Sequence, residues 1–327
     1  MMTVSWFVTR STTRRSRAAA LSLTAVWCAA WLFPFKGPVH AGPATQPFGD
    51  ATIRGAAGNS EIVITTTAAM AGAIQSLTWN GKEFIDRADH GRELQSALGM
   101  DCGVYPFNPE TFNPTEAGSR DDGAGPASTS KLLELRADGQ TLISRSQMAF
   151  WLKPGEKSSG QIAQNGKALS DYILGKRVHI GHGSLAHAIE YDVTFEFPVG
   201  EHHPMAQIEA LTGYMPPDLR TFYSFNAATG LLDAIDDGPG EQAKPLVFAT
   251  ASGSHAMGIY SPEHLSPGYG RFHFERERVE KWNCVFRLRN PDGVAAGKHE
   301  FHLFVVVGTR EDVRRTLVEL AKEFAVK

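Results

Sequence analysis

Residues 89–126 contain the side chains that acid–base chemistry requires. Their sequence, DHGRELQSALGMDCGVYPFNPETFNPTEAGSRDDGAGP, places carboxylates and amides on Pro-containing turns. Two carboxylates in one pocket can be driven to different pKa values and then serve as acid and base, the arrangement that glycosidases use. We therefore predict Glu110 and Glu116 as catalytic residues, and Asn113 and Arg120 as substrate-binding residues. The alternative is that these side chains only cap turns.

The start of this segment adds an imidazole and a guanidinium. His90 titrates near neutral pH, and Arg92 offers a planar fork for a carboxylate or sugar hydroxyl. We predict His90 as a catalytic acid–base residue and Arg92 as a substrate-binding residue. The alternative is a surface pairing of Arg92 with Glu93 or Asp89. A connection this long is uncommon unless it binds something or is disordered, and its aromatic residues argue against disorder. We expect a polar loop that forms one wall of a binding site.

A second pair of histidines lies in the sequence HIGH, which begins at His179. We expect these residues at a strand end, with His179 and His182 on the same face, and predict that His179 takes part in proton transfer. A plain surface strand is the alternative. Zinc would need a third ligand at useful spacing, and the DDG sequence at Asp121 lacks the regular spacing of a calcium loop. We therefore predict no metal site.

Aromatic and polar residues in the second half of the chain could hold a sugar. Tyr214 and Tyr223 are candidates for stacking on a pyranose ring. Trp282 begins a predicted strand and could stack on ligand or fill the core. Glu241 ends a Gly-Pro-Gly turn of the kind found in sugar-binding loops. No phosphate-binding loop, dinucleotide fingerprint or nucleophile elbow is present in the sequence, so we expect no cofactor.

The N-terminal 41 residues have the features of a cleavable signal peptide. Four arginines precede an apolar run over residues 18–33, and Val39-His40-Ala41 supplies a small-residue cleavage site. The apolar run is about sixteen residues, shorter than the roughly twenty that span a bilayer, so a membrane anchor is the weaker alternative. We expect a periplasmic or secreted protein without a membrane partner.

The net charge argues against nucleic acid as a partner, and the cysteine content allows one disulfide. Removal of residues 1–41 reduces the 32 Lys and Arg of the whole chain to 27, against 35 Asp and Glu, for a formal net charge of −8. An acidic chain is a poor partner for nucleic acid. Cys102 and Cys284 remain after cleavage, and in an exported protein they could form one disulfide or stay as two thiols.

Strand-like alternation dominates residues 42–327, which we expect to form a single β-sandwich domain. The sequence TWNGKEFI predicts a hairpin, with Asn80-Gly81 at the two positive-φ positions of a type I′ turn. Helical periodicity occurs only at the end, where Thr309 can cap a helix. Predicted strands cover residues 61–67, 73–79, 82–86, 141–152, 188–197, 206–214, 245–250, 255–260, 282–289 and 299–307.

Three stretches together resemble a known family. SLTWNGKEFI followed by DHGRELQ, the run of strands, and FHLFVVVGTREDVRRTLVEL are similar to the galactose mutarotase-like supersandwich proteins. That group includes aldose 1-epimerases and the sugar-binding domains of several glycosidases and polysaccharide lyases. The resemblance implies an antiparallel β-sandwich, with His90 and Arg92 where the family places an early sugar-holding arginine. TFYSFN, by contrast, lacks the histidine of the epimerase acid motif.

These observations define the functional hypotheses. We expect an exported carbohydrate-active protein that cleaves a glycosidic bond in an oligo- or polysaccharide, by hydrolysis or β-elimination. An extended polar wall suits a chain of sugars better than a monosaccharide. The alternatives are an aldose epimerase-type isomerase and a non-catalytic carbohydrate-binding protein.

Overall fold

The computed structural model describes residues 48–87, 93–120, 122, 125–263, 268–274 and 278–325. All of them belong to one compact unit, Thr45–Lys327. The predicted signal peptide therefore lies outside the described residues. So do His90 and Arg92.

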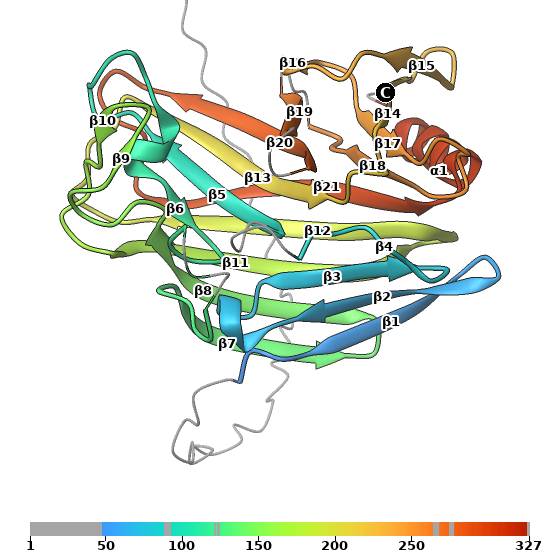
Figure 1. Ribbon diagram of the computed structural model, residues 1–327, viewed down its shortest axis with the longest axis horizontal. Helices are drawn as coiled ribbons and strands as arrows, with labels where there is room; N and C mark the ends of the chain where they lie inside the picture. The colour runs from blue at the N-terminus through green and yellow to red at the C-terminus, as the bar shows by residue number, and fades with distance from the viewer. Residues whose placement is uncertain are drawn as a thin grey trace, which may run out of the picture. The chain divides into compact units, whose positions relative to one another are not determined.

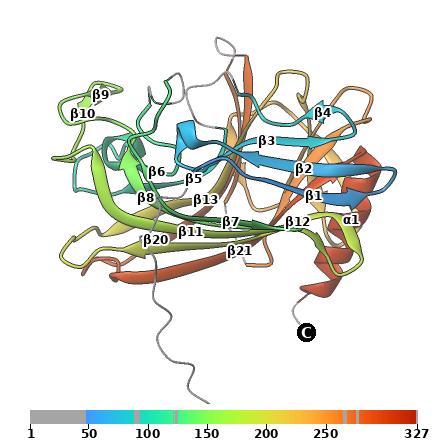
Figure 2. The same cartoon turned by 90° about the horizontal axis from the view of Figure 1, so that it is seen from below.

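Antiparallel strands make up most of the described chain and confirm the predicted all-β sandwich (Figures 1 and 2). Within the described residues, 19 strands pair into one continuous network that folds into two facing layers. The first sheet runs in the order β1 (Thr52–Ala57), β2 (Ser60–Thr66), β3 (Ile74–Trp79), β5 (Leu94–Met100), β13 (Met205–Met215), β20 (Val279–Arg289), β19 (Tyr269–Phe274) and β16 (Gly240–Gln242).

The second sheet packs against the inner face of the first. Its order is β7 (Lys131–Asp138), β8 (Thr141–Phe150), β11 (Leu169–His182), β12 (Leu185–Phe197), β21 (Gly297–Gly308), β18 (Ala256–Tyr260), β17 (Leu246–Ala249), β14 (Thr221–Asn226) and β15 (Leu231–Ile235). Short elements complete the fold: β4 (Lys82–Glu83), β6 (Pro114–Thr115), β9 (Lys157–Ser158), β10 (Gln161–Ile162) and the 3-10 helices η1 (Ala68–Met70) and η2 (Pro109–Phe112). Because β6 pairs with both β5 and β8, it joins the two sheets.

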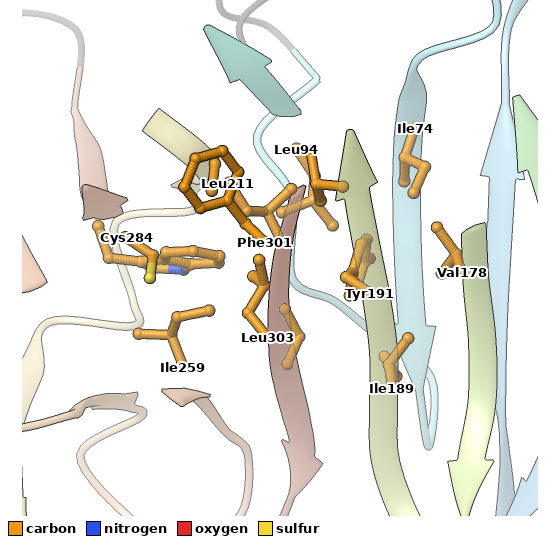
Figure 3. Close-up of a cluster of buried hydrophobic side chains, with 14 of the residues drawn as sticks. Ile74, Leu94, Val178, Ile189, Tyr191, Leu211, Ile259, Cys284, Phe301 and Leu303 are labelled. Atoms are coloured by element: carbon orange, nitrogen blue, oxygen red, sulfur yellow. The ribbon is translucent and has the colours of Figure 1, made fainter. Parts of the chain in front are cut away.

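The core lies between the sheets, because alternate residues of each strand point inward. Figure 3 shows part of it, where Leu94, Leu211 and Cys284 of the first sheet lie near Tyr191 and Leu303 of the second. All five side chains are buried. The two cysteines of the described chain are free thiols, so of the two alternatives the structure has thiols rather than a disulfide.

Helix α1 (Arg310–Glu323) covers part of the outer face of the second sheet, beside β12, β18 and β21. The predicted cap is confirmed: the Thr309 hydroxyl accepts a hydrogen bond from the Asp312 backbone N–H, and Asp312 accepts one from the Thr309 backbone N–H. Gly258 lets the helix approach β18, since a Cβ there would lie 2.9 Å from a Val313 methyl group. None of the described helices is both long enough and apolar enough to span a bilayer.

The local predictions were partly confirmed. The hairpin is confirmed, with φ of 49° at Asn80 and 74° at Gly81. Each of the ten predicted strand ranges overlaps an observed strand. The expected polar loop over residues 89–126 was partly wrong, because Leu94–Met100 is a central strand in which all seven residues are buried.

Candidate functional site

A cavity of about 140 Å³ lies on the outer face of the first sheet. Its floor is formed by β5, β13 and β20, where Gln95 and Ala97 alternate with the core residues Leu94 and Leu98. The cavity is lined by Gln95, Ala97, Glu110, Asn113, Thr115, Trp151, Glu209, Thr212, Tyr214, Phe274 and Lys281. Carboxylates, amides, hydroxyls, one ammonium group and aromatic rings therefore converge on one hollow.

Strand register places the floor residues side by side. Gln95 lies opposite Thr212, Ala97 opposite Glu209, and Tyr214 opposite Lys281. The register of β13 shifts between Glu209 and Thr212, so a β-bulge adds one residue there. Glu209 and Thr212 are three residues apart and would face opposite ways in a regular strand; the bulge turns both toward the cavity.

An ion pair dominates the electrostatics of the floor. The Lys281 Nζ atom lies 3.3 Å from the Glu209 Oε2 atom, and only 13% and 18% of the two side chains are exposed. The same ammonium lies 5.1 Å from the ring centroid of Tyr214 and 5.6 Å from that of Phe272. Because partly buried charges are screened less than surface charges, this pair can polarise or bind a polar ligand.

The wall of the cavity comes from the connection between β5 and β7. Asn108 caps η2 by accepting a hydrogen bond from the Glu110 backbone N–H at 3.1 Å, which fixes the turn that presents Glu110. The Ser158 hydroxyl donates to the Glu110 carboxylate. Asn113 donates through its side chain to the Leu98 carbonyl oxygen. Three predicted site residues, Glu110, Asn113 and Tyr214, thus lie together.

Glu116 lies elsewhere, although it is only six residues from Glu110. Its carboxylate accepts a hydrogen bond from the Lys176 ammonium at 2.6 Å and one from the Ser96 backbone N–H at 3.0 Å. Both charged side chains are almost fully buried, 2% and 3% exposed. A carboxylate committed to an internal ion pair holds the connection onto the sandwich, and the geometry does not favour the predicted catalytic role of Glu116.

The predicted histidine also lies outside the cavity. His179 is on β11 of the second sheet, where its Nδ1 atom lies 2.9 Å from the Thr141 hydroxyl. The predicted shared face with His182 is consistent with the structure, because the β11–β12 register shifts between Ile180 and His182, where Gly181 has a φ of 94°, and regular alternation ends there. His182 lies 3.0 Å from Glu323 of α1. The arrangement joins the sheet to the helix.

Of the remaining predicted ligand-binding residues, two lie in structural contacts on or near the second sheet. The Arg310 guanidinium donates to the Tyr223 hydroxyl at 2.7 Å, which ties β14 to α1. Arg120 pairs with Glu156 at 3.0 Å. Neither Tyr223 nor Arg120 lines the cavity, so their predicted binding roles stay predictions.

The predicted substrate-binding residues Trp282 and Glu241 lie on the first sheet. Trp282 packs in the core with 1% of its surface exposed, so the structure places it on the opposite side of β20 from the cavity. Glu241 on β16 forms a two-pronged ion pair with Arg287, with contacts of 2.7 and 2.9 Å. Arg287 also donates to Gln207 at 3.1 Å. Glu241 therefore belongs to a polar row that continues along the strands beyond the cavity.

Sequence reasoning missed Gln95, Glu209, Thr212 and Lys281. The signal was present in MAQIEALTGYM, where polar residues alternate with apolar ones along a strand that is otherwise core. A polar group in that pattern faces away from the core. The alternation was visible, but which of several polar faces is hollowed depends on the connection that crosses it.

Comparison with known proteins supports the fold. No protein-family model and no curated protein matches this chain. A protein in glycosyl hydrolase family 38 from Enterococcus faecalis is 11% identical, over 87% of this chain and 33% of its own, with a TM-score of 0.50. An α-mannosidase from Enterococcus faecalis V583 is 10% identical over 79% and 30%, with a TM-score of 0.48.

Another structural neighbour is matched over nearly all of its own length. The Slr1438 protein from Synechocystis sp. PCC 6803 is 9% identical over 82% of this chain and 99% of its own, with a TM-score of 0.43. The family 38 likeness is consistent with the mutarotase-like fold expected from the sequence, and it concerns the fold alone. This chain spans about a third of that hydrolase.

The cavity can support acid–base chemistry with its own side chains. Glu110 and Glu209 offer two carboxyl groups, Lys281 an ammonium, Tyr214 a phenol, and Gln95 an amide. Among the described residues, no group of three or more His, Cys, Asp or Glu side chains is arranged to hold a metal ion. Side chains of these types can transfer protons and hydrogen-bond to a polar ligand.

Proposed function

We propose that this protein binds an oligo- or polysaccharide in the cavity of the first sheet and cleaves a glycosidic bond there by acid–base catalysis. The observation that carries the proposal is the convergence of Glu110 and Glu209 with Lys281 in one partly enclosed hollow. Carboxyl pairs of this kind serve glycosidases. The fold shared with part of a glycosyl hydrolase is compatible with such a role but does not assign it.

The residues divide into three roles. Tyr214 and Trp151 supply aromatic surface for the apolar face of a sugar ring. The amides of Gln95 and Asn113 suit sugar hydroxyls, since an amide both donates and accepts hydrogen bonds. We assign the base role to Glu209, whose carboxylate lies 3.3 Å from the Lys281 ammonium on the cavity floor.

We assign the complementary acid role to Glu110. In hydrolysis, its carboxyl group gives a proton to the glycosidic oxygen as the bond breaks, and Glu209 takes a proton from the attacking water. The products are two shorter sugars, and the two carboxyl groups are restored by proton exchange with water. A mature chain with net charge −8 further favours a carbohydrate over nucleic acid as the ligand.

A panel of neutral, uronic and amino-sugar polysaccharides tests this proposal. New reducing ends report hydrolysis, and absorbance of unsaturated products reports β-elimination. Glu209→Gln and Glu110→Gln should each lower kcat by at least about 100-fold while leaving affinity within a few-fold, because proton transfer contributes 10²–10⁴-fold. Glu196→Gln, a carboxylate 43% exposed on the second sheet, is the matched control and should keep full activity.

Other outcomes separate the alternatives. Saturable binding that Lys281→Met weakens, without turnover of any glycan, would identify a non-catalytic carbohydrate-binding protein. Interconversion of monosaccharide anomers without chain cleavage would identify an epimerase-type isomerase. Absence of binding to every glycan in the panel would rule out the carbohydrate proposal.

We also propose that the chain is exported to the periplasm or the exterior. The arginine-rich start, apolar run and small-residue site of residues 1–41 support this. The mass of the protein recovered outside the cytoplasm should correspond to a chain that starts at residue 42. Recovery of the full-length chain from the cytoplasm alone would contradict export.

A further inference from the structure

A cluster of nucleophilic and titratable side chains lies where β5 ends and β13 begins. The Cys102 Sγ atom is 3.8 Å from the His203 Nδ1 atom, and the His203 Nε2 atom is 3.2 Å from the Glu201 carboxylate. The Tyr172 hydroxyl donates to the same carboxylate at 2.5 Å. None of these residues lines the cavity of the first sheet. The thiol, the imidazole and the carboxylate therefore contact one another in a row, the arrangement of a nucleophile, a base and a group that orients the base.

Hydrogen-bond chemistry defines the state of the imidazole. The His203 Nδ1 atom lies 3.1 Å from the Asp101 carbonyl oxygen, which can only accept, so this nitrogen carries a proton. The Nε2 atom faces the Glu201 carboxylate and carries the second proton. Burial lowers the pKa of His203, but its contacts with Cys102, Glu201 and the Asp101 carbonyl outweigh that effect and raise the pKa to about 10. The ring is thus an imidazolium at neutral pH.

The charges around the sulfur are balanced. Glu201 is an anion, since hydrogen bonds from His203 and Tyr172 outweigh burial and lower its pKa; nearby Asp171 opposes them. The Asp101 carboxylate is occupied by the Gly103 backbone N–H at 2.8 Å and the Tyr105 hydroxyl at 2.9 Å. The Glu201 charge neutralises one side of the imidazolium, whose Nδ1–H edge is shared between the Asp101 carbonyl and the sulfur.

Cys102 lies at the edge of the core, next to an exposed segment of the chain. Cys102 is partly exposed, and the four residues that follow it are exposed, with Tyr105 at 70%. Cys284, by contrast, is fully buried, and burial raises the pKa of its thiol. A protonated histidine beside a thiol favours its thiolate form. Cys102 lies beside such a histidine at the edge of the core, whereas Cys284 is buried within it.

We propose that Cys102 is a modification site at which a His203-stabilised thiolate exchanges with low-molecular-weight disulfides. The Cys102 sulfur attacks one sulfur of the disulfide and forms a new S–S bond, and the original S–S bond breaks. The departing thiolate leaves with the electron pair and takes a proton from water. The incoming disulfide is the oxidant, so one thiol is released for each Cys102 converted to a mixed disulfide. This site is independent of the carbohydrate proposal.

The pH dependence of the reaction with 4,4′-dipyridyl disulfide tests the proposal. The experiment uses the full chain with the substitution Cys28→Ser, which leaves Cys102 and Cys284 as the two cysteines. Peptide mass mapping then shows which of the two carries the mixed disulfide. Glutathione is measured under the same conditions and gives the pH profile of an ordinary thiol. An ordinary thiol with a pKa of about 8.5 slows by about 80-fold between pH 8 and pH 6. The Cys102 rate should change by less than about threefold.

Variants link that behaviour to the cluster. His203→Gln should slow the reaction at pH 6 by at least about tenfold and restore the pH profile of an ordinary thiol. His299→Gln, which removes an imidazole from an exposed contact with the Ala295 carbonyl, should leave the rate unchanged. Cys102→Ser should abolish the fast thiol release.

Two results would overturn the proposal. One is a wild-type profile that follows glutathione between pH 6 and pH 8. The other is a folded His203→Gln variant, shown by circular dichroism, that keeps the wild-type rate at pH 6. If His203→Gln does not fold, the wild-type profile and the adduct map decide alone, because neither needs a variant of the cluster.

Discussion

The two outer faces of the sandwich differ in what they present. On the second sheet, β12, β17, β18 and β21 carry apolar side chains such as Val247, Phe304 and Val306, and α1 buries them under Leu317 and Leu320. On the first sheet, β5, β13 and β20 carry Gln95, Glu209 and Lys281 around a cavity.

The difference shows how one architecture separates stability from function. An apolar face has to be removed from water, at about 25 cal/mol per Å², so it acquires a helix. A polar face needs no such cover, so a connection with polar side chains can cross it and leave a hollow. The proposed sugar site lies on the first sheet, and α1 packs against the second.

Lys176→Met should destabilise the protein most. It leaves the Glu116 carboxylate, 3% exposed, without its ammonium partner inside the sandwich. Breaking a buried ion pair costs about 3–5 kcal/mol because the remaining charge is uncompensated. Denaturant unfolding measures the loss. Replacing Glu116 and Lys176 together by methionine should recover much of it, and a double variant as unstable as the single one would contradict this account.

Leu317→Ala should lower the free energy of unfolding by about 3 kcal/mol, because it opens a cavity under α1. Glycan binding should stay within about twofold, since the helix and the cavity lie on different sheets. Thermal unfolding with and without ligand separates the two effects. Glu319→Ala, an exposed residue of the same helix, is the control. A large loss of binding in Leu317→Ala would break the division between the faces.

His203→Gln tests a polar cluster that belongs to neither outer face. The pKa of His203 is raised in the folded state to about 10, so its contribution is fully present below pH 6.5 and is lost as pH rises through about 10. The variant should be less stable by about 2 kcal/mol at pH 6. That difference should shrink toward pH 10. Unfolding curves across this range check the sign, and a difference that grows with pH would contradict it.

Lys281→Met should weaken glycan binding and leave stability nearly unchanged, the reverse of the effects expected for Leu317→Ala. Loss of the ammonium beside Glu209 should weaken glycan binding by at least about tenfold, equal to about 1.4 kcal/mol. Stability should change by less than about 1 kcal/mol, as expected for a partly exposed pair. Calorimetric titration and thermal unfolding measure the two quantities. Unchanged binding would place the sugar elsewhere.

Thr309→Ala should have the smallest effect, a loss of about 1 kcal/mol, because it removes only the N-cap of α1. Thr309→Ser should retain most of the stability, since its hydroxyl can make the same hydrogen bond. Equal losses in both variants would show that packing of the Thr309 methyl group, rather than capping, stabilises the helix start.

Much of the fold could be predicted because its signals are local. Asn80-Gly81 specified the turn, and Thr309 with Asp312 specified the start of α1. The strand β5 was missed because it carries the buried polar residues Gln95 and Ser96, so its sequence LQSALGM is neither a continuous apolar run nor a regular alternation. Its polar residues serve internal contacts, such as the Gln95 carbonyl that accepts from the Ala117 backbone N–H at 3.0 Å.

For the site, local sequence was enough to predict one wall, with its carboxylates and amides on Pro-containing turns, including Glu110 and Asn113. Which of these side chains reach the cavity depends on the folded chain: Glu110 lines it, while Glu116 turns inward to Lys176. The tertiary structure also added Glu209 and Lys281 from strands more than ninety residues further along the chain. The reason is that side-chain direction in a turn or bulge depends on long-range pairing, and no local pattern of residues encodes which distant strand will lie beside it.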